Sequence, residues 1–376
     1  MKYIDEFRRG DLAKKLAGVI AEEADPDRDY SVMEFCGGHT HAIFRYGVQD
    51  LMPPNVRFVH GPGCPVCVLP IGRIDNAIEL AERHDAILCT YGDMMRVPAG
   101  ARRSLLTAKA AGADIRMIYS TQDALKIARA NPDREVVFFA IGFETTTPPT
   151  AVALKQARAE RLENFSVFCN HVLTPAALKH MLDSAGTADG AVAIDGFLGP
   201  SHVSSVIGSR PYEPFADTYR RPVVIAGFEP LDVMQSTLMV IRQLNQGRHE
   251  VENQYSRVVT RDGNPVAKTV MAEVLETRPS FEWRGLGEVP DSALRIRDTF
   301  ADLDAERRFE VTPSRQHDVK GCECPAILRG VKKPTDCKLF GTVCTPDNPM
   351  GSCMVSSEGA CAAYWTFGRF RREAAA

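Results

Sequence analysis

The stretch Y-S-V-M-E-F-C-G-G-H-T-H, residues 30–41, sets the pattern for the rest of the chain. An apolar run that predicts a β-strand ends in Cys36, and two glycines then permit a sharp turn before His39 and His41. The next residues predict a helix, so Cys36 is expected at a strand end facing a helix N-terminus, where a thiolate is favoured. Thiolate and imidazole together indicate a soft metal site or an activated nucleophile. The alternative is a small buried cysteine in a glycine turn.

From residue 30 to residue 228, short apolar runs alternate with segments of helical periodicity. Such alternation predicts parallel β-sheets with helices on both faces. Strands are expected at 31–35, 56–60, 86–90, 115–118, 135–141, 166–170, 190–194 and 222–226, and helices at 71–83, 101–111, 151–160, 175–184, 202–207 and 231–244.

The two halves of this region resemble each other. F-C-G-G-H-T-H at 35–41 and I-G-F-E-T-T-T at 141–147 each combine a strand end, a glycine turn and a polar helix start. We therefore expect two similar α/β domains, 30–132 and 133–228, facing each other across a cleft. Ligands of parallel sheets bind at the carboxyl ends of the strands, where the polar loops fall. Residues 1–29 and 229–376 are expected to form a third unit, mainly helical or irregular.

Composition limits the possible functions. The chain has 376 residues, of which 44% are apolar and 25% charged, which is typical of a soluble protein with two or three domains. A formal net charge of −3 gives no reason to expect nucleic acid or an anionic membrane as a partner. The charged N-terminal sequence is unlike a signal peptide, and no run of about 18 apolar residues could span a bilayer. We expect a cytoplasmic protein.

Cysteine usage indicates metal or redox chemistry. Structural disulfides are rare in the cytoplasm, yet the chain has eleven cysteines. Five are spread over the first half and six lie between residues 322 and 361. The first group is Cys36, Cys64, Cys67, Cys89 and Cys169, and the second is Cys322, Cys324, Cys337, Cys344, Cys353 and Cys361.

The motif H-G-P-G-C-P-V-C, residues 60–67, contains a C-x-x-C pair. This spacing is typical of a redox dithiol, in which one thiolate attacks and its neighbour resolves. It is also half of a zinc or cluster site. The prolines and glycines favour a tight turn over a zinc knuckle, and this half of the chain has no second C-x-x-C. Redox chemistry at Cys64 and Cys67 is therefore favoured over metal ligation or a structural role.

Two acidic residues are placed to enter the cleft. Asp93, in Y-G-D-M-M-R-V-P, follows an expected strand, and its alternative role is to cap the next helix. Glu144, in G-F-E-T-T-T-P, lies at a helix start that could bind an anion or position a proton. The motif lacks the P-loop pattern, so ATP hydrolysis is not supported. His171 and His202 are interpreted as core or loop histidines.

The C-terminal cysteines give the strongest single signal. Four of them form C-x14-C-x6-C-x16-C without an intervening histidine ligand, which favours an iron–sulfur cluster or a Zn(Cys)4 site. Zinc sites usually show two close pairs, which this spacing lacks, so we favour a [4Fe–4S] cluster. Cys324 and Cys353 remain as a possible pair. Glu358 lies among these cysteines and either relays protons or is an ordinary surface residue.

Together, these motifs resemble those of the HypD family, iron–sulfur proteins of [NiFe]-hydrogenase maturation. The matching blocks are F-C-G-G-H-T-H, G-P-G-C-P-V-C, Y-G-D-M-M-R-V-P, G-F-E-T-T-T-P and the terminal C-x-C…C-x6-C…G-x-C-M-V-S-x-E-G-x-C. They extend from residue 31 to the end, so the resemblance covers nearly the whole chain. No position that would carry chemistry departs from the pattern.

The resemblance implies a scaffold that, with the small partner HypC, assembles the Fe(CN)2CO group of the hydrogenase active site. Cyanide would come from HypE, acting with HypF. Cys36 would ligate this iron, with His39 nearby as a ligand or proton handler and Asp93 in the same pocket. Cys64 and Cys67 would form a redox dithiol beside it. The protein would be a monomer alone or a heterodimer with HypC, and not a conventional turnover enzyme.

The same resemblance implies how the C-terminal cysteines divide. The [4Fe–4S] ligands would be Cys322, Cys337, Cys344 and Cys361, and a second dithiol or disulfide would be Cys324 with Cys353. Electrons would pass from cluster to dithiol to iron, similar to ferredoxin:thioredoxin reductase. Two alternatives stay open: a cluster-dependent thiol–disulfide reductase acting on protein disulfides, and a zinc-stabilised α/β binding module without a redox role.

Overall fold

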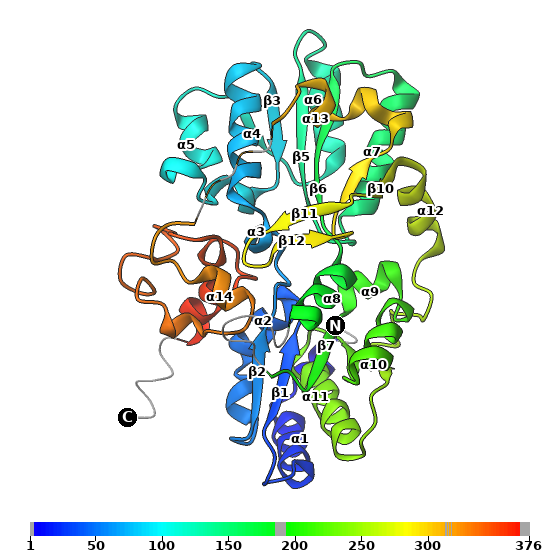
Figure 1. Cartoon of the computed structure of the whole chain (residues 1–376), viewed down its shortest axis with the longest axis vertical. Helices are drawn as coiled ribbons and strands as arrows, with labels where there is room; N and C mark the ends of the chain where they lie inside the picture. Colours follow the sequence, from blue (N-terminus) through cyan, green and yellow to red (C-terminus); the bar gives the residue numbers. More distant parts are fainter. Residues whose placement is uncertain (1–3, 185–192, 313, 315, 317, 369–376) are drawn as a thin grey trace.

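A computed structural model describes residues 4–184, 193–312, 314, 316 and 318–368. The chain forms an α/β fold with two parallel sheets, one at each end of the molecule (Figure 1). The larger sheet has the strand order β2-β1-β7-β8-β9, and the smaller has the order β4-β3-β5-β6. Every pair of neighbouring strands in these two sheets is parallel. The expected α/β class with parallel sheets is confirmed.

The described elements have these bounds. The strands are β1 (Tyr30–Glu34), β2 (Val56–His60), β3 (Ile87–Thr90), β4 (Ile115–Met117), β5 (Val136–Gly142), β6 (Phe165–His171), β7 (Gly196–Pro200), β8 (Val223–Ala226), β9 (Val251–Asn253), β10 (Leu275–Thr277), β11 (Ser280–Trp283), β12 (Gly287–Pro290) and β13 (Leu294–Ile296). The α-helices are α1 (Gly10–Glu23), α2 (Gly37–Tyr46), α3 (Pro65–Val68), α4 (Ile71–Arg83), α5 (Leu105–Ala110), α6 (Thr121–Ala130), α7 (Thr147–Glu160), α8 (Thr174–Ser184), α9 (Ser201–Ile207), α10 (Glu213–Tyr219), α11 (Pro230–Asn245), α12 (Pro265–Val274), α13 (Ala305–Arg308), α14 (Cys324–Leu328) and α15 (Ala360–Ala363).

Helices cover both faces of each sheet, which explains why central strands such as β1 and β5 are buried along their whole length. On the larger sheet, Tyr30 and Val32 point toward the side covered by α1, α2 and α11, while Met33 packs on the opposite side. On the smaller sheet, α6 and α7 cover the face that carries Phe138, and α4 and α5 cover the face that carries Phe139. Neighbouring residues of one strand thus enter different cores.

The sheets do not follow the expected ranges 30–132 and 133–228. Strands β1 and β2 pair with β7 and β8, whereas β3 and β4 pair with β5 and β6. Helices α1 and α11 pack together on the larger sheet, and α12 packs on α7 beside the smaller one. Hydrophobic periodicity identifies strands but carries no information about which parallel neighbour each strand selects. The chain therefore crosses from one sheet to the other and back.

One expected strand is displaced. Of the range 190–194, residues 190–192 lie outside the described residues, and the strand that follows is β7 at Gly196–Pro200. Its sequence, G-F-L-G-P, contains two glycines and a proline, residues that weaken the sequence signal of a strand. Among the described residues, no helix combines the length and apolar character needed to cross a bilayer.

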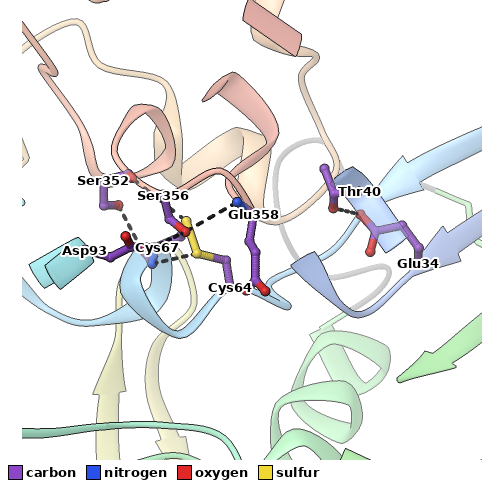
Figure 2. Close-up of a disulfide and its surroundings, with 8 residues drawn as sticks. All are labelled: Glu34, Thr40, Cys64, Cys67, Asp93, Ser352, Ser356 and Glu358. Atoms are coloured by element: carbon purple, nitrogen blue, oxygen red, sulfur yellow. Dashed lines mark hydrogen bonds between the residues drawn. A yellow bond between two sulfur atoms is a disulfide. The ribbon is translucent and has the colours of Figure 1, made fainter. Parts of the chain in front are cut away.

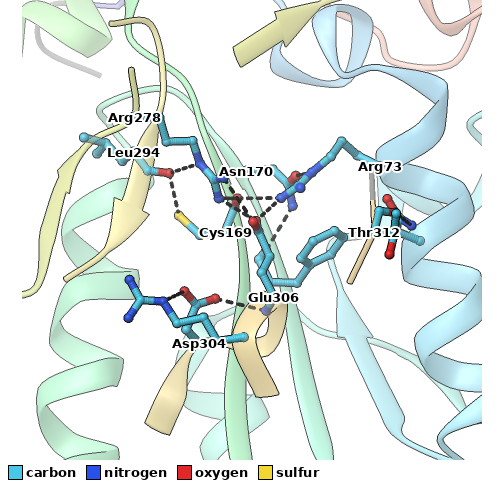
Figure 3. A network of polar contacts seen from close by, with 11 residues as sticks. Arg73, Cys169, Asn170, Arg278, Leu294, Asp304, Glu306 and Thr312 are labelled. Atoms are coloured by element: carbon cyan, nitrogen blue, oxygen red, sulfur yellow. Dashed lines mark hydrogen bonds and ion pairs between the residues drawn. The ribbon is translucent and has the colours of Figure 1, made fainter. Parts of the chain in front are cut away.

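A largely buried ionic network joins the two sides of the smaller sheet (Figure 3). Glu306 of α13 pairs with Arg73 of α4 and with Arg278, whose Nη2 lies 2.5 Å from Glu306 Oε1. Both guanidiniums also donate to the backbone oxygen of Cys169, at 3.0 and 3.3 Å. Burial alone would raise the pKa of Glu306, but the charges of Arg73 and Arg278 lower it to about 2.

Replacing Glu306 with alanine is expected to lower the free energy of unfolding by about 3 kcal/mol, because two mostly buried guanidiniums would lose their counter-charge. Urea unfolding followed by circular dichroism measures the loss. The matched control is Asp302→Ala, which breaks the exposed Arg158–Asp302 pair and should change stability by less than about 1 kcal/mol. Equal effects of the two variants would contradict a stabilising role for the network.

Candidate functional site

A cavity of about 490 Å³ lies between the two sheets, at the carboxyl ends of their strands. Its walls come from the loops after β1, β2, β3, β5 and β7 and from the C-terminal segment. Lining residues that bear on chemistry are Cys36, Asp93, Thr145, Thr146, His202 and Glu358. Parallel-sheet proteins bind ligands at such strand ends. Segments far apart in the sequence, including the C-x-x-C loop and the C-terminal segment, therefore meet here.

Cys36 occupies the turn between β1 and α2. Its carbonyl oxygen accepts the N–H groups of His39 and Thr40 at 2.9 and 3.2 Å, and its own N–H donates to Glu34 Oε2 at 2.9 Å. Burial raises the pKa of the Cys36 thiol, and the carboxylates of Glu358 and Glu34 act in the same direction. The helix N-terminus does not outweigh burial, contrary to the expected thiolate. The thiol stays protonated unless a cation binds and displaces the proton.

Glu34 is a buried carboxylate of this site that the sequence reasoning missed. It accepts a hydrogen bond from the Thr40 hydroxyl (Figure 2). It also accepts from the Cys36 N–H and, at 2.8 Å, from Nδ1 of His60. The contacts tie β1, β2 and α2 together behind Cys36. A lone acidic residue inside a strand that is buried along its length was the signal that could have identified it.

Gly63 allows the loop after β2 to lie directly against Cys36. The Gly37 N–H donates to the Gly63 oxygen at 3.1 Å, and a Cβ atom at Gly63 would lie 2.4 Å from the Cys36 nitrogen. That atom is backbone and cannot rotate away. The close approach holds the dithiol loop next to the thiol of Cys36.

Replacing Gly63 with alanine is therefore expected to destabilise the protein by about 1–3 kcal/mol, because the two loops must separate. Chemical denaturation measures this change. Gly18→Ala is the control: a Cβ there meets no atom within 4 Å, and alanine favours the interior of α1. A Gly63→Ala protein as stable as Gly18→Ala would contradict the close contact.

Cys64 and Cys67 form a disulfide at the start of α3, with Cα atoms 5.2 Å apart. Both residues are buried, and the Cys67 N–H donates to Cys64 Sγ at 3.3 Å. Ser352, from the C-terminal segment, donates its hydroxyl to the Cys67 carbonyl oxygen at 2.9 Å (Figure 2). The C-x-x-C pair is thus oxidised here and covered by the segment that carries the C-terminal cysteines.

The same segment reaches the cavity through Ser356 and Glu358. The Ser356 hydroxyl donates to Asp93 Oδ2 at 2.9 Å, and the Glu358 N–H donates to the Ser356 hydroxyl at 3.3 Å. Glu358 packs closely on Gly37. A Cβ atom added to Gly37 would lie 2.4 Å from the Cβ atom of Glu358. Burial and the nearby Asp93 raise the pKa of Glu358. Glu358 is therefore part of the cavity wall and not an ordinary surface residue.

His39 and His202 have different surroundings near the cavity. His39 is fully buried, its Nε2 lies 2.9 Å from the Ala226 oxygen, and its Nδ1 has no hydrogen-bond partner among the described residues. Burial lowers the pKa of His39, so the ring is neutral. His202 lines the cavity, and its ring centroid lies 3.8 Å from that of Phe228, which also contacts His39. His202 was considered from the sequence as a core or loop histidine, and its place at the cavity was not anticipated.

Glu144 borders a second cavity of about 540 Å³, while its neighbours Thr145 and Thr146 line the first. Its carboxylate accepts the Thr174 N–H at 2.9 Å and the Thr174 hydroxyl at 3.0 Å. Burial raises the pKa of Glu144 to about 7 despite these hydrogen bonds. Glu144 is therefore not in the same cavity as Cys36.

A raised acidic pKa makes stability fall as pH rises. Between pH 4.5 and about 7 the folded state binds the Glu144 proton more tightly than the unfolded state. The wild type should lose up to about 3 kcal/mol across this range relative to Glu144→Gln, which is neutral throughout. Thermal unfolding at several pH values measures the difference. A constant difference between the two proteins would show that Glu144 titrates normally.

Five of the six C-terminal cysteines are buried, and Cys322 is partly exposed. Cys322 and Cys324 lie side by side, because a Cβ at Gly351 would be 2.5 Å from both sulfur atoms. The pKa of Cys324 is raised by its contacts with the thiols of Cys322 and then Cys353. Cys324 and Cys353 therefore belong to the same group as the expected ligands. Such a set of thiols suits an iron–sulfur cluster in its chemistry.

Within the described residues, no group of three or more His, Cys, Asp or Glu side chains is already arranged to hold a metal ion. The expected ligand set, Cys322, Cys337, Cys344 and Cys361, therefore stays a prediction, as do the roles of Cys36, His39, Asp93 and the C-x-x-C pair. The C-terminal segment around α14 lies beside the junction of the two lobes (Figure 1), and there Ser352 contacts Cys67 and Ser356 contacts Asp93.

Known proteins resemble this chain over its whole length. A family model, HypD, described as "Hydrogenase formation hypA family", matches residues 11–368. The hydrogenase maturation factor HypD of Rhizobium leguminosarum bv. viciae is 67% identical over 374 residues, covering 99% of this chain and 97% of the relative. That of Cupriavidus necator is 66% identical over 372 residues, covering 99% and 98%. That of Escherichia coli K12 is 45% identical over 379 residues, covering all of both.

These matches confirm the resemblance that the sequence motifs indicated, and they include each of the cysteine-bearing segments. The chain therefore belongs to the HypD family of hydrogenase maturation factors.

Proposed function

We propose that the chain is a redox-active scaffold that, together with HypC, assembles and carries the Fe(CN)2CO group for [NiFe]-hydrogenases. The observation that supports this most is the path of the C-terminal segment. The Ser352 hydroxyl donates a hydrogen bond to the carbonyl oxygen of Cys67 in the dithiol motif. The Ser356 hydroxyl donates to the carboxylate of Asp93 in the cavity that Cys36 lines. One short stretch thus links the cysteine-rich end, the dithiol and a cavity that carries a thiol.

Cys36 would bind the iron as cargo. Iron carrying cyanide and carbon monoxide favours a soft thiolate ligand, and Cys36 supplies the thiol among the described residues lining the cavity. Asp93, His202 and Glu358 share that cavity and would accept or return protons as the thiol ionises. His39, turned toward Ala226, would hold the α2 turn in place. Cyanide would arrive from HypE, acting with HypF.

The dithiol and the C-terminal cysteines would manage electrons. Reducing the Cys64–Cys67 disulfide takes two electrons and two protons and gives two thiols. A [4Fe–4S] cluster bound by Cys322, Cys337, Cys344 and Cys361 would supply those electrons one at a time. Cys353 adjoins Ser352, which contacts Cys67, so Cys324 and Cys353 would form a second dithiol between the two centres.

The burial of the disulfide favours the scaffold over the thiol–disulfide reductase. Cys64 is 3% exposed and Cys67 is fully buried, so a protein disulfide could not reach either sulfur without moving the Ser352 segment. A reductase needs an accessible attacking thiol. Electrons that pass from the dithiol to a group bound in the neighbouring Cys36 cavity would stay inside the protein. Such a transfer does not require the Ser352 segment to move.

Infrared and Mössbauer spectroscopy on anaerobic protein purified with HypC would test the proposal. The expected result is a set of cyanide and carbon monoxide bands, together with a broad absorption near about 400 nm that dithionite bleaches. A colourless protein containing zinc would favour the structural zinc module. A coloured protein without infrared bands, but active on protein disulfides, would favour the reductase.

A further inference from the structure

Arg284 is a buried cation whose guanidinium has no hydrogen-bond acceptor within the described part of the chain. Its side chain is only 2% exposed, and Nε, Nη1 and Nη2 have no acceptor among the described residues. The nearest acid is Asp318, with Oδ1 3.4 Å from Nε. A guanidinium carries five N–H donors, and burying them unsatisfied is costly.

The backbone around Arg284 is fixed on two sides. The residue follows β11, in the turn of the β11–β12 hairpin. Its N–H donates to the Val68 oxygen at 2.7 Å, one residue beyond Cys67 of the dithiol. On the other side, the Gly285 oxygen accepts from Arg329 Nη1 at 2.8 Å, just past α14. The hairpin therefore joins the dithiol helix to the helix that begins at Cys324.

The guanidinium lies beside the C-terminal cysteines. Arg284 and Gly351 line the same cavity of about 210 Å³, and Gly351 contacts the sulfur atoms of Cys322 and Cys324. A buried positive charge thus lines the cavity whose Gly351 wall contacts the sulfur atoms of Cys322 and Cys324.

We propose that Arg284 donates hydrogen bonds to sulfur at the iron–sulfur cluster and sets its reduction potential. The inference rests on the proposed function, which assigns a cluster to these cysteines. One-electron reduction adds one negative charge to the cluster, and a buried cation beside it stabilises the reduced form more than the oxidised form. Arg284 therefore makes the cluster a better acceptor from a one-electron donor, and its backbone joins that site to the dithiol.

The alternative is that Arg284 only holds Asp318 and the hairpin in place. The two readings differ in what charge-changing variants do. If Arg284 acts on the cluster, removing its charge and removing the Asp318 charge shift the potential in opposite directions. If the pair is only structural, either change lowers stability and leaves the potential of any bound cluster unchanged.

The experiment is a redox titration of the anaerobic full-length protein with dithionite as electron donor, followed by absorbance and electron paramagnetic resonance. Arg284→Gln should lower the equilibrium constant for one-electron reduction at least tenfold, a shift of about 59 mV to more negative potential. Arg284→Lys should retain most of the wild-type value, and Asp318→Asn should raise the constant. The control, Arg158→Gln, removes an exposed guanidinium paired with Asp302 and should change nothing.

An Arg284→Gln protein that binds the cluster with the wild-type potential would overturn the inference and leave the proposed function intact. If Arg284→Gln does not fold, Asp318→Asn and Arg284→Lys decide, and an unchanged potential in Asp318→Asn overturns it. A wild-type protein without iron–sulfur absorption would overturn the cluster assignment and, with it, the inference. The two failures are therefore distinguishable.

Discussion

A Cys36→Ala protein purified with HypC is expected to show no infrared bands of iron-bound cyanide and carbon monoxide, while its absorption near about 400 nm is unchanged. Cys36 is the thiol among the described residues that line the cavity, so no other cysteine there can replace it. The fold should persist, because Cys36 makes its hydrogen bonds to Glu34, His39 and Thr40 through backbone atoms that alanine retains.

Cys89→Ala is the matched control for this experiment. Cys89 is a fully buried cysteine of β3 that packs among apolar residues of the smaller sheet. The Cys89→Ala substitution removes the same side-chain atoms as Cys36→Ala, but Cys89 does not line the cavity, so the infrared bands should remain. Bands that persist in a folded Cys36→Ala protein would contradict the assignment of Cys36 as the iron ligand, whatever the behaviour of the control.

A Cys337→Ser protein is expected to lose the iron–sulfur absorption and the stability of residues 318–368. In this segment the described α-helices are only four and five residues long, which provides little regular hydrogen bonding. Where regular structure is sparse, metal binding supplies much of the folding free energy. Iron content, visible absorption and limited proteolysis measure the effect. The two parallel sheets should keep their circular dichroism signal.

Cys169→Ala provides the comparison, because Cys169 lies in β6 and donates its thiol to the Leu294 oxygen, away from the C-terminal group. Its iron content should equal that of the wild type. Cys353→Ala should also retain the cluster if the predicted division between ligands and dithiol holds. A Cys337→Ser protein with an unchanged spectrum would instead require Cys324 or Cys353 among the ligands.

Much of the secondary structure follows from local sequence. The helix expected at 71–83 is α4, with the same bounds, and β2 lies at 56–60 as expected. Such elements are determined by periodicity and by the turns beside them. The pairing of β1 with β7 could not be predicted this way. The paired residues, such as Val32 and Gly196, are far apart in the sequence, and tertiary packing determines which strands become neighbours.

Residues of the candidate site could be predicted where they belong to a motif whose residue types indicate a chemical role. Cys36, Asp93 and Glu358 were each selected from their motifs, and the structure places all three at one cavity. Glu34 lies inside the opening motif but was read as part of its strand, and Arg284 lies outside the motifs, so both were missed. Their importance arises from burial and from neighbours far away in sequence, such as His60 and Gly351. Local patterns carry neither kind of information.

The strand order of the larger sheet has a consequence for biosynthesis. Its second strand, β1, is translated early, but its neighbour β7 begins only at Gly196, after the whole of the smaller sheet. During translation, β1 and β2 therefore leave the ribosome before β7 exists, so the edge of β1 that will pair with β7 is unpaired. The strands of the smaller sheet are made in the meantime. A nascent chain stalled before residue 196 should need a chaperone to stay in solution, and this need should fall once β7, β8 and the covering helix α11 have been translated.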